Sequence, residues 1–251
     1  MSSTMNSETN TVAPNQILDS CDSTNAIAKQ FAQSGLPEGT WICSRSQTAG
    51  RGRLGREWIS EEGNLYLSYL TRVENPAILT WLPLTTTVAL REAVSVWAPK
   101  AEVSIKWPND LWVGVKKLAG VLCEHVSGPY GLTVVGIGLN LRKAPATGVS
   151  LSELTSHELQ IDQVLPEVLQ RLKTWFALLN EKGTGPVEET YYQHALFKRG
   201  TAVEWGGMEN QEVGIVKELG AHGELLVMMS GGREKALFAE DVFRVRTSRQ
   251  L

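Results

Sequence analysis

The first two thirds of the chain carry apolar runs of strand length. Each run is rich in apolar, β-branched or aromatic residues and ends at a turn residue, which is typical of strands. The predicted strands are 40–43, 63–72, 103–106, 111–113, 118–126 and 132–141. Gly136 and Gly138 interrupt the last of these runs. Glycine inside a strand often marks the close approach of a ligand or another backbone.

Other segments repeat their apolar residues at helical spacing. Residues 22–25 (Asp-Ser-Thr-Asn) open a short helix that ends at Gly35. Residues 79–97 predict a second helix, with Pro83 in its first turn, where proline is tolerated. The apolar stripe from Val168 to Leu179 predicts a third, core-facing helix.

The pattern changes near Phe197. From residue 200 onward, short strands alternate with glycine turns, which predicts a small β-barrel or sandwich. These strands are 202–205, 212–218, 225–229, 235–238 and 242–246. The first residues are polar and predict a disordered tail. We therefore predict three parts, a disordered tail (1–14), a catalytic domain (15–197) and a small C-terminal domain (198–251).

Composition narrows the class of protein. The 251 residues are 42% hydrophobic and 20% charged, with a net charge of −3, which favours a globular protein over a nonspecific DNA-binding one. We expect neither a membrane span nor a secretory signal. The odd number of cysteines, 3, argues for a reducing, cytoplasmic compartment. None of the 4 histidines shows metal-ligand spacing.

The densest cationic segment is Gly50 to Arg56, Gly-Arg-Gly-Arg-Leu-Gly-Arg, with Arg45 just upstream. Guanidinium groups bind carboxylate and phosphate with two hydrogen bonds, and glycine lets backbone N–H groups approach a ligand. The loop also matches a dinucleotide-binding fingerprint, but no helix is predicted after it. A P-loop would need Lys-Ser/Thr where Arg56-Glu57 stands. A basic surface turn remains the alternative.

A second polar segment, Lys106-Trp107-Pro108-Asn109-Asp110, joins two predicted strands, and Lys117-Leu118-Ala119-Gly120 follows one turn later. Two lysines and an acid beside a glycine suit a site for phosphate and carboxylate. Taken singly, Asn109-Asp110 is also ordinary turn chemistry, and Lys116-Lys117 is also an ordinary hairpin tip.

Together these segments resemble the biotin protein ligase family. The matching pieces are Asp22 to Asn25, Gln47 to Arg56, Lys106 to Asp110, Lys117 to Gly120 and Gly136 to Asn140, in the family's order and spacing. The likeness covers residues 17 to 246. It implies an α+β fold: a mixed sheet with flanking helices, like class II aminoacyl-tRNA synthetases, plus a C-terminal SH3-like barrel.

The resemblance also implies the reaction. The biotin carboxylate attacks the α-phosphate of ATP, and biotinyl-AMP and pyrophosphate form. A lysine of an acceptor then takes the biotinyl group. The implied cofactor is Mg²⁺, and the implied acceptor is the biotin carboxyl carrier protein of acetyl-CoA carboxylase. Because only a short segment precedes Asp22, we expect no DNA-binding domain. We expect a monomer or a homodimer.

Roles for individual residues follow from the same resemblance. The implied catalytic residues are Lys117, Arg53 and Arg51. The implied biotin contacts are Ser23, Thr24, Asn25, Gln47, Gly50, Arg51, Gly52, Arg53, Trp58, Lys117, Gly120, Gly136 and Gly138. The implied nucleotide contacts are Arg51, Arg53, Lys106, Asn109, Asp110, Lys117 and Asn140, with Asp110 as a Mg²⁺ ligand.

Two alternatives come from other classes. A lipoate or octanoate transferase shares a related fold, but its apolar acyl chain would not call for the polar group Ser23, Thr24 and Gln47. A biotin sensor without activity would not need Lys117, Asp110 and Asn140 on the nucleotide side.

Overall fold

A computed structural model describes residues 12–127, 131–155, 157–206, 211–239 and 245–247. Most of the predicted disordered tail and the start of the predicted strand 242–246 lie outside these ranges. Within them, Val12 packs against a small apolar cluster under the first helix.

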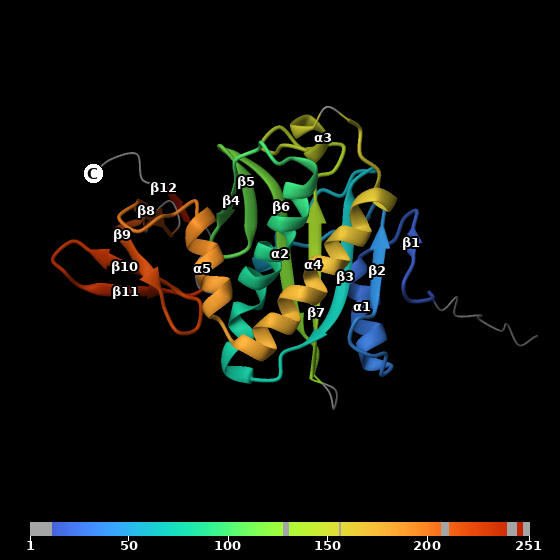
Figure 1. Ribbon diagram of the computed structural model, residues 1–251, viewed down its shortest axis with the longest axis horizontal. Coiled ribbons are helices and arrows are strands. Elements are labelled where there is room, and N and C mark those ends of the chain that lie inside the picture. The colour runs from blue at the N-terminus through green and yellow to red at the C-terminus, as the bar shows by residue number, and fades with distance from the viewer. Residues whose placement is uncertain (1–11, 128–130, 156, 207–210, 240–244, 248–251) are drawn as a thin grey trace, which may run out of the picture.

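A seven-stranded sheet forms the centre of the molecule (Figure 1). Its strands, in spatial order, are β1 (Ile17–Leu18), β2 (Trp41–Ser44), β3 (Leu65–Arg72), β7 (Leu132–Leu139), β6 (Lys116–His125), β5 (Asp110–Val113) and β4 (Val103–Lys106). Strands β1 and β2 pair in parallel, and the other neighbours pair antiparallel. The prediction of a mixed sheet is therefore confirmed. The two-residue strand β1 was not predicted.

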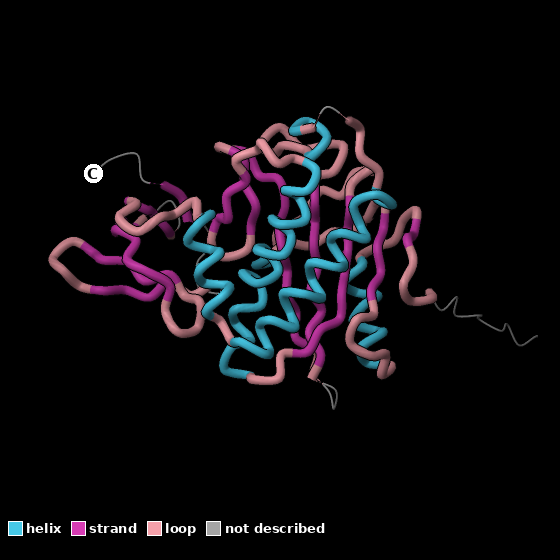
Figure 2. Tube along the Cα trace, viewed as in Figure 1, coloured by secondary structure: helices cyan, strands magenta, loops and turns pink. Residues whose placement is uncertain are grey.

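Helices cover both faces of this sheet (Figure 2). Helices α2 (Leu82–Trp97), α4 (Ile161–Lys182) and α5 (Gly185–His194) form one layer, and α1 (Thr24–Gln33) lies on the opposite face. The predicted helix 79–97 starts later than expected, because Pro76–Trp81 form a 3₁₀ turn and Pro83 stands in the first turn of α2. The short helix α3 (Leu151–Leu154) and helix α5 were not predicted.

The central strands are buried on both faces, and their alternate residues enter different cores. In β7, Val135, Ile137 and Leu139 join the large core that includes α2 and α4. Leu132 and Val134 point the other way and pack in the smaller core of α1. This two-sided burial explains why β7 is a continuous apolar run in the sequence.

The next two positions on the α1 face of β7 are Gly136 and Gly138. Because successive residues of a strand alternate between faces, these glycines continue the row that Leu132 and Val134 begin. They carry no side chain, so β7 presents only its backbone at the N-terminal end of α1. This bare stretch is the floor of the cavity described below.

The C-terminal segment forms a second, five-stranded sheet that is antiparallel throughout. Its spatial order is β11 (Glu234–Leu237), β10 (Leu225–Met229), β9 (Glu212–Leu219), β8 (Ala202–Trp205) and β12 (Val245–Thr247). The predicted SH3-like barrel is consistent with this sheet. The large core continues without a break into Val203, Val216 and Leu225 of this sheet. The boundary at residues 197/198 stays a prediction.

Two indole groups join the sheets. Trp81 donates its Nε1–H to the carbonyl of Ala221 at 2.8 Å, and Trp107 donates to the carbonyl of Gly223 at 2.9 Å. Both carbonyls belong to the turn between β9 and β10. The contacts fix that turn against the main sheet.

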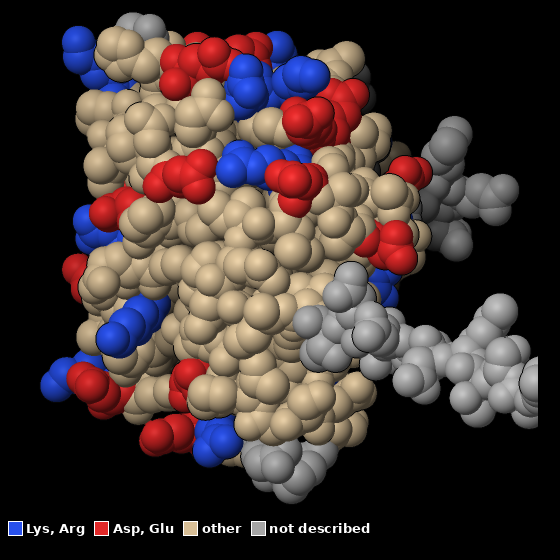
Figure 3. Space-filling model, turned by 90° about the vertical axis from the view of Figure 1, so that its right-hand side faces the viewer, with Lys and Arg blue, Asp and Glu red and all other residues tan. Residues whose placement is uncertain are grey.

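The face on the β1 and α1 side carries both signs of charge. In Figure 3, acidic and basic side chains are interspersed there and do not form a patch of one sign. No helix among the described residues has both the length and the apolar character needed to cross a membrane.

Replacing Trp81 by phenylalanine tests the indole contact. Trp81 is only 1% exposed, so the substitution leaves the Ala221 carbonyl unpaired beside a buried gap. We expect the free energy of unfolding to fall by about 2 kcal/mol. Urea denaturation measures it. Trp97→Phe is the control, because the Trp97 indole N–H has no hydrogen-bond partner in the described structure. An equal loss of unfolding free energy in the two variants would show that the hydrogen bond from Trp81 to Ala221 does not contribute to stability.

Candidate functional site

A cavity of about 180 Å³ opens over the bare stretch of the main sheet. Its walls come from the start of α1, the basic loop, the turn between β4 and β5, and strands β6 and β7. One residue of the second sheet, Val245, also lines it. Segments far apart in the sequence therefore meet at one place.

The floor is a row of small residues across neighbouring strands. Gly138 of β7 pairs with Gly120 of β6, which pairs in turn with Asp110 of β5. The ring of Trp58 lies directly on this floor. A Cβ atom added to Gly138 would lie 2.5 Å from Cε2 of Trp58, and one added to Gly120 would lie 3.0 Å from Cζ3. Only glycine permits this close approach.

One end of the cavity is neutral and polar. The side-chain oxygen of Gln47 accepts a hydrogen bond from the backbone N–H of Thr24 at 2.9 Å, and the Thr24 hydroxyl lies 3.1 Å from the same oxygen. The Gln47 amide nitrogen donates to Ser60 at 3.0 Å. Ser23 is the residue before α1 and makes no side-chain capping bond to the helix. The Thr24 hydroxyl is likewise directed to Gln47 and Ser68, so helix capping does not account for these residues.

The basic loop folds into a tight hairpin. Arg51 and Glu57 form an isolated antiparallel bridge, and Gly52 N–H donates to the Arg56 carbonyl at 2.7 Å. At its tip, Leu54 adopts a φ of 55°, which is strained for a side chain with a Cβ. No α-helix follows the loop, so the dinucleotide-binding alternative is excluded.

Gly50 holds the base of this hairpin. A Cβ atom there would lie 2.3 Å from the Ser60 hydroxyl and 2.4 Å from the Trp58 carbonyl. Gly50 does not line the cavity itself. It permits the backbone contact that brings Trp58 over the floor.

The opposite end of the cavity is cationic. Lys117 pairs with Asp110 at 2.7 Å, and its Nζ lies 4.9 Å from the centre of the Trp58 ring. Arg53 donates to the side-chain oxygen of Asn109 at 3.0 Å and to the backbone carbonyl of Ala239, just after β11 of the second sheet. Lys106 stacks over Trp112, with 3.8 Å between Nζ and the ring centre. These side chains are held at positions that face the cavity.

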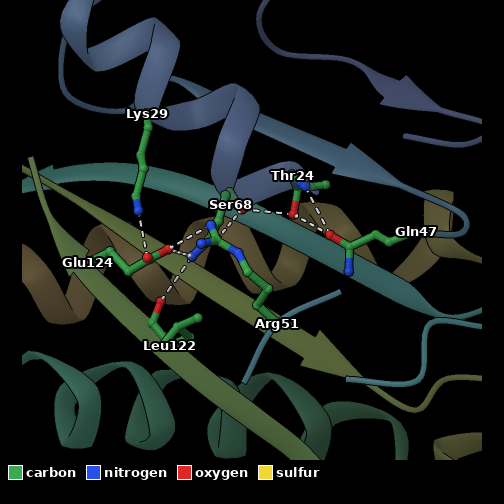
Figure 4. Close-up of polar contacts among 8 residues, drawn as sticks. Thr24, Lys29, Gln47, Arg51, Ser68, Leu122 and Glu124 are labelled. Carbon is green, nitrogen blue, oxygen red and sulfur yellow. Dashed lines mark hydrogen bonds and ion pairs between the residues drawn. The ribbon is translucent and has the colours of Figure 1, made fainter. Parts of the chain in front are cut away.

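A further carboxylate lies at the edge of the neutral end (Figure 4). Glu124 accepts hydrogen bonds from Lys29 at 2.6 Å and from Asn25 at 2.7 Å, and Arg51 lies 3.5 Å away. Burial alone would raise the pKa of Glu124, but the bonds from Lys29 and Asn25 and the charge of Arg51 hold that pKa below its usual value. Glu124 is therefore ionised at neutral pH.

Most of the residues predicted from the sequence gather around this one cavity. Those that line it are Ser23, Thr24, Asn25, Gln47, Arg51, Gly52, Arg53, Trp58, Lys106, Asn109, Asp110, Lys117, Gly120, Gly136 and Gly138. Gly50 and Asn140 do not line it. The assigned contacts with biotin or nucleotide stay predictions.

Asn140 lies behind the cavity wall. Its amide donates to the backbone carbonyls of Lys117 and Val149, at 3.1 and 3.3 Å. This geometry holds the start of β6, and with it the Lys117 side chain, in place. The contact of Asn140 with a nucleotide stays a prediction.

The structure adds residues to which the sequence gave no role. Arg56, Glu57, Tyr66 and Trp107 line the cavity, and Ser68, Lys29 and Glu124 complete its hydrogen-bond network. One signal was available for Ser68 and Glu124. Both lie on strands, in positions that share a face with the glycines of β7.

The thiols are unsuited to nucleophilic catalysis. Burial raises the pKa of Cys123 to about 12 and that of Cys43 to about 12, so both are neutral near pH 7. Cys123 packs in the large core, on the sheet face opposite to the cavity floor. Neither Cys43 nor Cys123 is therefore available as a nucleophile in the cavity.

Comparison with known proteins agrees with this geometry. The Biotin/lipoate A/B protein ligase family matches residues 17–140. A biotin–[acetyl-CoA-carboxylase] ligase of Paracoccus denitrificans is 32% identical over 88% of this chain and 97% of that protein. A ligase of the same name from Mycobacterium tuberculosis is 31% identical over 89% and 86%. The biotin protein ligase of Aquifex aeolicus, solved with biotin and ATP, superposes with a TM-score of 0.80 at 30% identity, covering 93% of this chain and 98% of that one.

Gly138→Ala tests the floor of the cavity. The added Cβ must displace Trp58 or distort β7, because the two would otherwise lie 2.5 Å apart. We expect the affinity for biotin to fall about tenfold, as is typical when a tight contact is overpacked. Isothermal titration calorimetry measures it. Gly185→Ala is the control, since a Cβ at that position in α5 meets nothing within 4 Å. Unchanged affinity in Gly138→Ala would contradict the floor assignment.

Proposed function

The chain belongs to the biotin protein ligases of the biotin/lipoate A/B protein ligase family, and we propose that this cavity binds biotin and ATP together. In this proposal the protein makes biotinyl-AMP from these two substrates. It then transfers the biotinyl group to a lysine of a carrier protein. The observation that carries the proposal is the position of Lys117. Its ammonium lies between the glycine floor under Trp58 and the polar turn of Asn109 and Asp110.

The two ends of the cavity suit the two substrates. The ureido group of biotin has N–H donors and a carbonyl acceptor, and Thr24, Gln47 and Ser68 offer both donors and acceptors. The bare floor accommodates the fused rings. The triphosphate needs cations, which Arg51, Arg53 and Lys117 supply. A long apolar acyl chain would leave the neutral polar end unpaired, which disfavours lipoate or octanoate.

The chemistry follows from charge. A carboxylate oxygen of biotin attacks the α-phosphorus of ATP, a new P–O bond forms, and the bond to pyrophosphate breaks. Both reactants are anions, so cations must hold them together and neutralise the charge that develops at phosphorus. In the second step the acceptor amine attacks the acyl carbon, AMP leaves, and the amine loses a proton. Neither step requires a covalent bond to the enzyme.

Mg²⁺ would enter this site with ATP. No group of three or more His, Cys, Asp or Glu side chains in the described part of the chain could hold a metal ion by itself. Mg²⁺ bound to a nucleotide commonly uses one or two protein carboxylates together with phosphate oxygens. Asp110 fits that need, since its carboxylate lines the cavity and already holds a cation, Lys117. When bound, Mg²⁺ would neutralise phosphate charge.

The family supports the biotin carboxyl carrier protein of acetyl-CoA carboxylase as the acceptor, because two relatives carry acetyl-CoA carboxylase in their names. The three free cysteines support a cytoplasmic location. We propose the monomer or the homodimer as the working form.

Exchange of labelled pyrophosphate into ATP tests this function directly. The exchange should depend on biotin and should be absent with lipoate or octanoate at equal concentration. Exchange with lipoate or octanoate alone would indicate the related acyl transferases. Biotin binding without any exchange would indicate a sensor. Mass spectrometry of the carrier domain then detects the transferred biotinyl group.

Lys117→Ala should lower the rate of biotin-dependent exchange by about 100- to 1,000-fold, because one cation beside the reacting phosphate is lost. Lys116→Ala is the matched control. Lys116 is the exposed neighbour of Lys117 and does not line the cavity. The control should keep the wild-type rate, and circular dichroism should show both variants folded. Wild-type exchange by Lys117→Ala would exclude Lys117 from the mechanism.

A further inference from the structure

Glu124 occupies a fixed place on the cavity face of the sheet. It pairs across β6 and β7 with Val134, next to the row that contains Leu122 and Gly136. From the other side, α1 presents Asn25 and Lys29 to it. These two residues are four apart on a helix, so they lie one above the other on one face. One carboxylate thus accepts hydrogen bonds from an amide and an ammonium group of a single helix.

The carboxylate determines which way the Asn25 amide points. Its Nδ2 group donates to Glu124 at 2.7 Å, and its oxygen accepts from the Ser68 hydroxyl at 2.6 Å. An ionised carboxylate can only accept hydrogen bonds. If the amide were reversed, its oxygen would face the carboxylate with no proton between them. Glu124 therefore excludes the reversed amide.

The fixed amide orients the groups beyond it. The Ser68 hydroxyl lies 2.6 Å from the Asn25 oxygen and 2.8 Å from the Thr24 hydroxyl. A hydroxyl has one proton, so when Ser68 donates it to Asn25, the Thr24 hydroxyl must donate its own proton to Ser68. The Gln47 oxygen then keeps the hydrogen bond from the Thr24 backbone N–H. The order of donors and acceptors at the neutral end is thus linked to Glu124.

Charge compensation around Glu124 is divided between two cations. Lys29 lies at 2.6 Å from one carboxylate oxygen, and Arg51 lies at 3.5 Å from the other. The Arg51 side chain is 46% exposed, whereas Glu124 is 20% exposed. When a phosphate draws Arg51 away, Lys29 still neutralises the buried carboxylate. The release of Arg51 then leaves no unpaired buried charge.

We propose that Glu124 is a positioning residue for biotin: by fixing the Asn25 amide, it sets which way the hydroxyl protons of Ser68 and Thr24 point. Lys29 keeps the Glu124 carboxylate ionised. This inference rests on the proposed function. It predicts that biotin binding weakens while ATP binding does not, because the network reaches the neutral end of the cavity and loss of Glu124 releases Arg51 to a phosphate instead of removing it.

Steady-state exchange kinetics with Glu124→Ala and Glu124→Gln test it. In Glu124→Ala the Asn25 amide can reverse, and we expect the KM for biotin to rise about tenfold while the KM for ATP stays within about twofold. Glu124→Gln keeps an oxygen that can accept from Asn25, so we expect most of the affinity for biotin to return. Calorimetric titration of biotin without ATP should show the same order of affinities.

Glu92→Ala is the matched control. Glu92 is also a partly buried carboxylate that accepts from two side chains, Arg171 at 3.3 Å and Trp175 at 2.9 Å, but it lies in the helix layer. Its loss should lower the thermal midpoint and leave both KM values unchanged. A biotin-specific rise in Glu92→Ala would mean that general destabilisation causes the effect, and would overturn the inference.

Two further outcomes would also reject the role of Glu124. One is an equal rise in both KM values in Glu124→Ala. The other is a Glu124→Gln variant as impaired as Glu124→Ala. A wild-type protein that shows no biotin-dependent exchange would remove the proposed function and this inference with it. Wild-type exchange together with normal kinetics in Glu124→Ala would remove the inference alone.

Discussion

The bare stretch of the central sheet is the constraint on which the site depends. Strands β3, β6 and β7 must be apolar on one face to bind the layer of α2 and α4. On the other face, α1 covers only part of the same strands. At the N-terminal end of α1, Gly138 and Gly120 stand side by side, and the ring of Trp58 lies over them in place of a helix. A cavity therefore forms without any gap in the large core. Because the floor is backbone, a single added methyl group would meet Trp58.

The charged groups of the site are paired within the protein. Lys117 is bound by Asp110, Arg51 by Glu124, and Arg53 by Asn109 and a carbonyl of the second sheet. These pairs keep the cations oriented and lower the cost of holding several of them together. A phosphate ligand must exchange places with the internal partners. The free energy of binding is then the difference between the ion pairs with the ligand and the ion pairs within the protein. This difference favours a multiply charged ligand over a single carboxylate.

The sequence predicted local features well, and long-range partnerships poorly. The glycines of β7, the arginine loop and the Lys106 to Asp110 turn stand out because each is locally unusual, and all of them meet at the cavity. Helix α5 begins with Gly185-Pro186, which resembles a turn, and most of its residues are polar. Lys29 and Glu124 each look like ordinary surface residues. Their pairing depends on how α1 lies against β6, and a single sequence contains no signal for it.

The second sheet takes part in the site through its backbone. Its turns supply carbonyl groups to Trp81, Trp107 and Arg53, all of which belong to the main body. A carbonyl has a fixed position once its turn is packed, whereas a side-chain acceptor would have rotamers to lose. Arg53 is thus held between Asn109, in the turn between β4 and β5, and Ala239, just after β11 of the second sheet. The position of Arg53 therefore depends on how the two sheets lie against each other. The continuous core between them is what maintains that position.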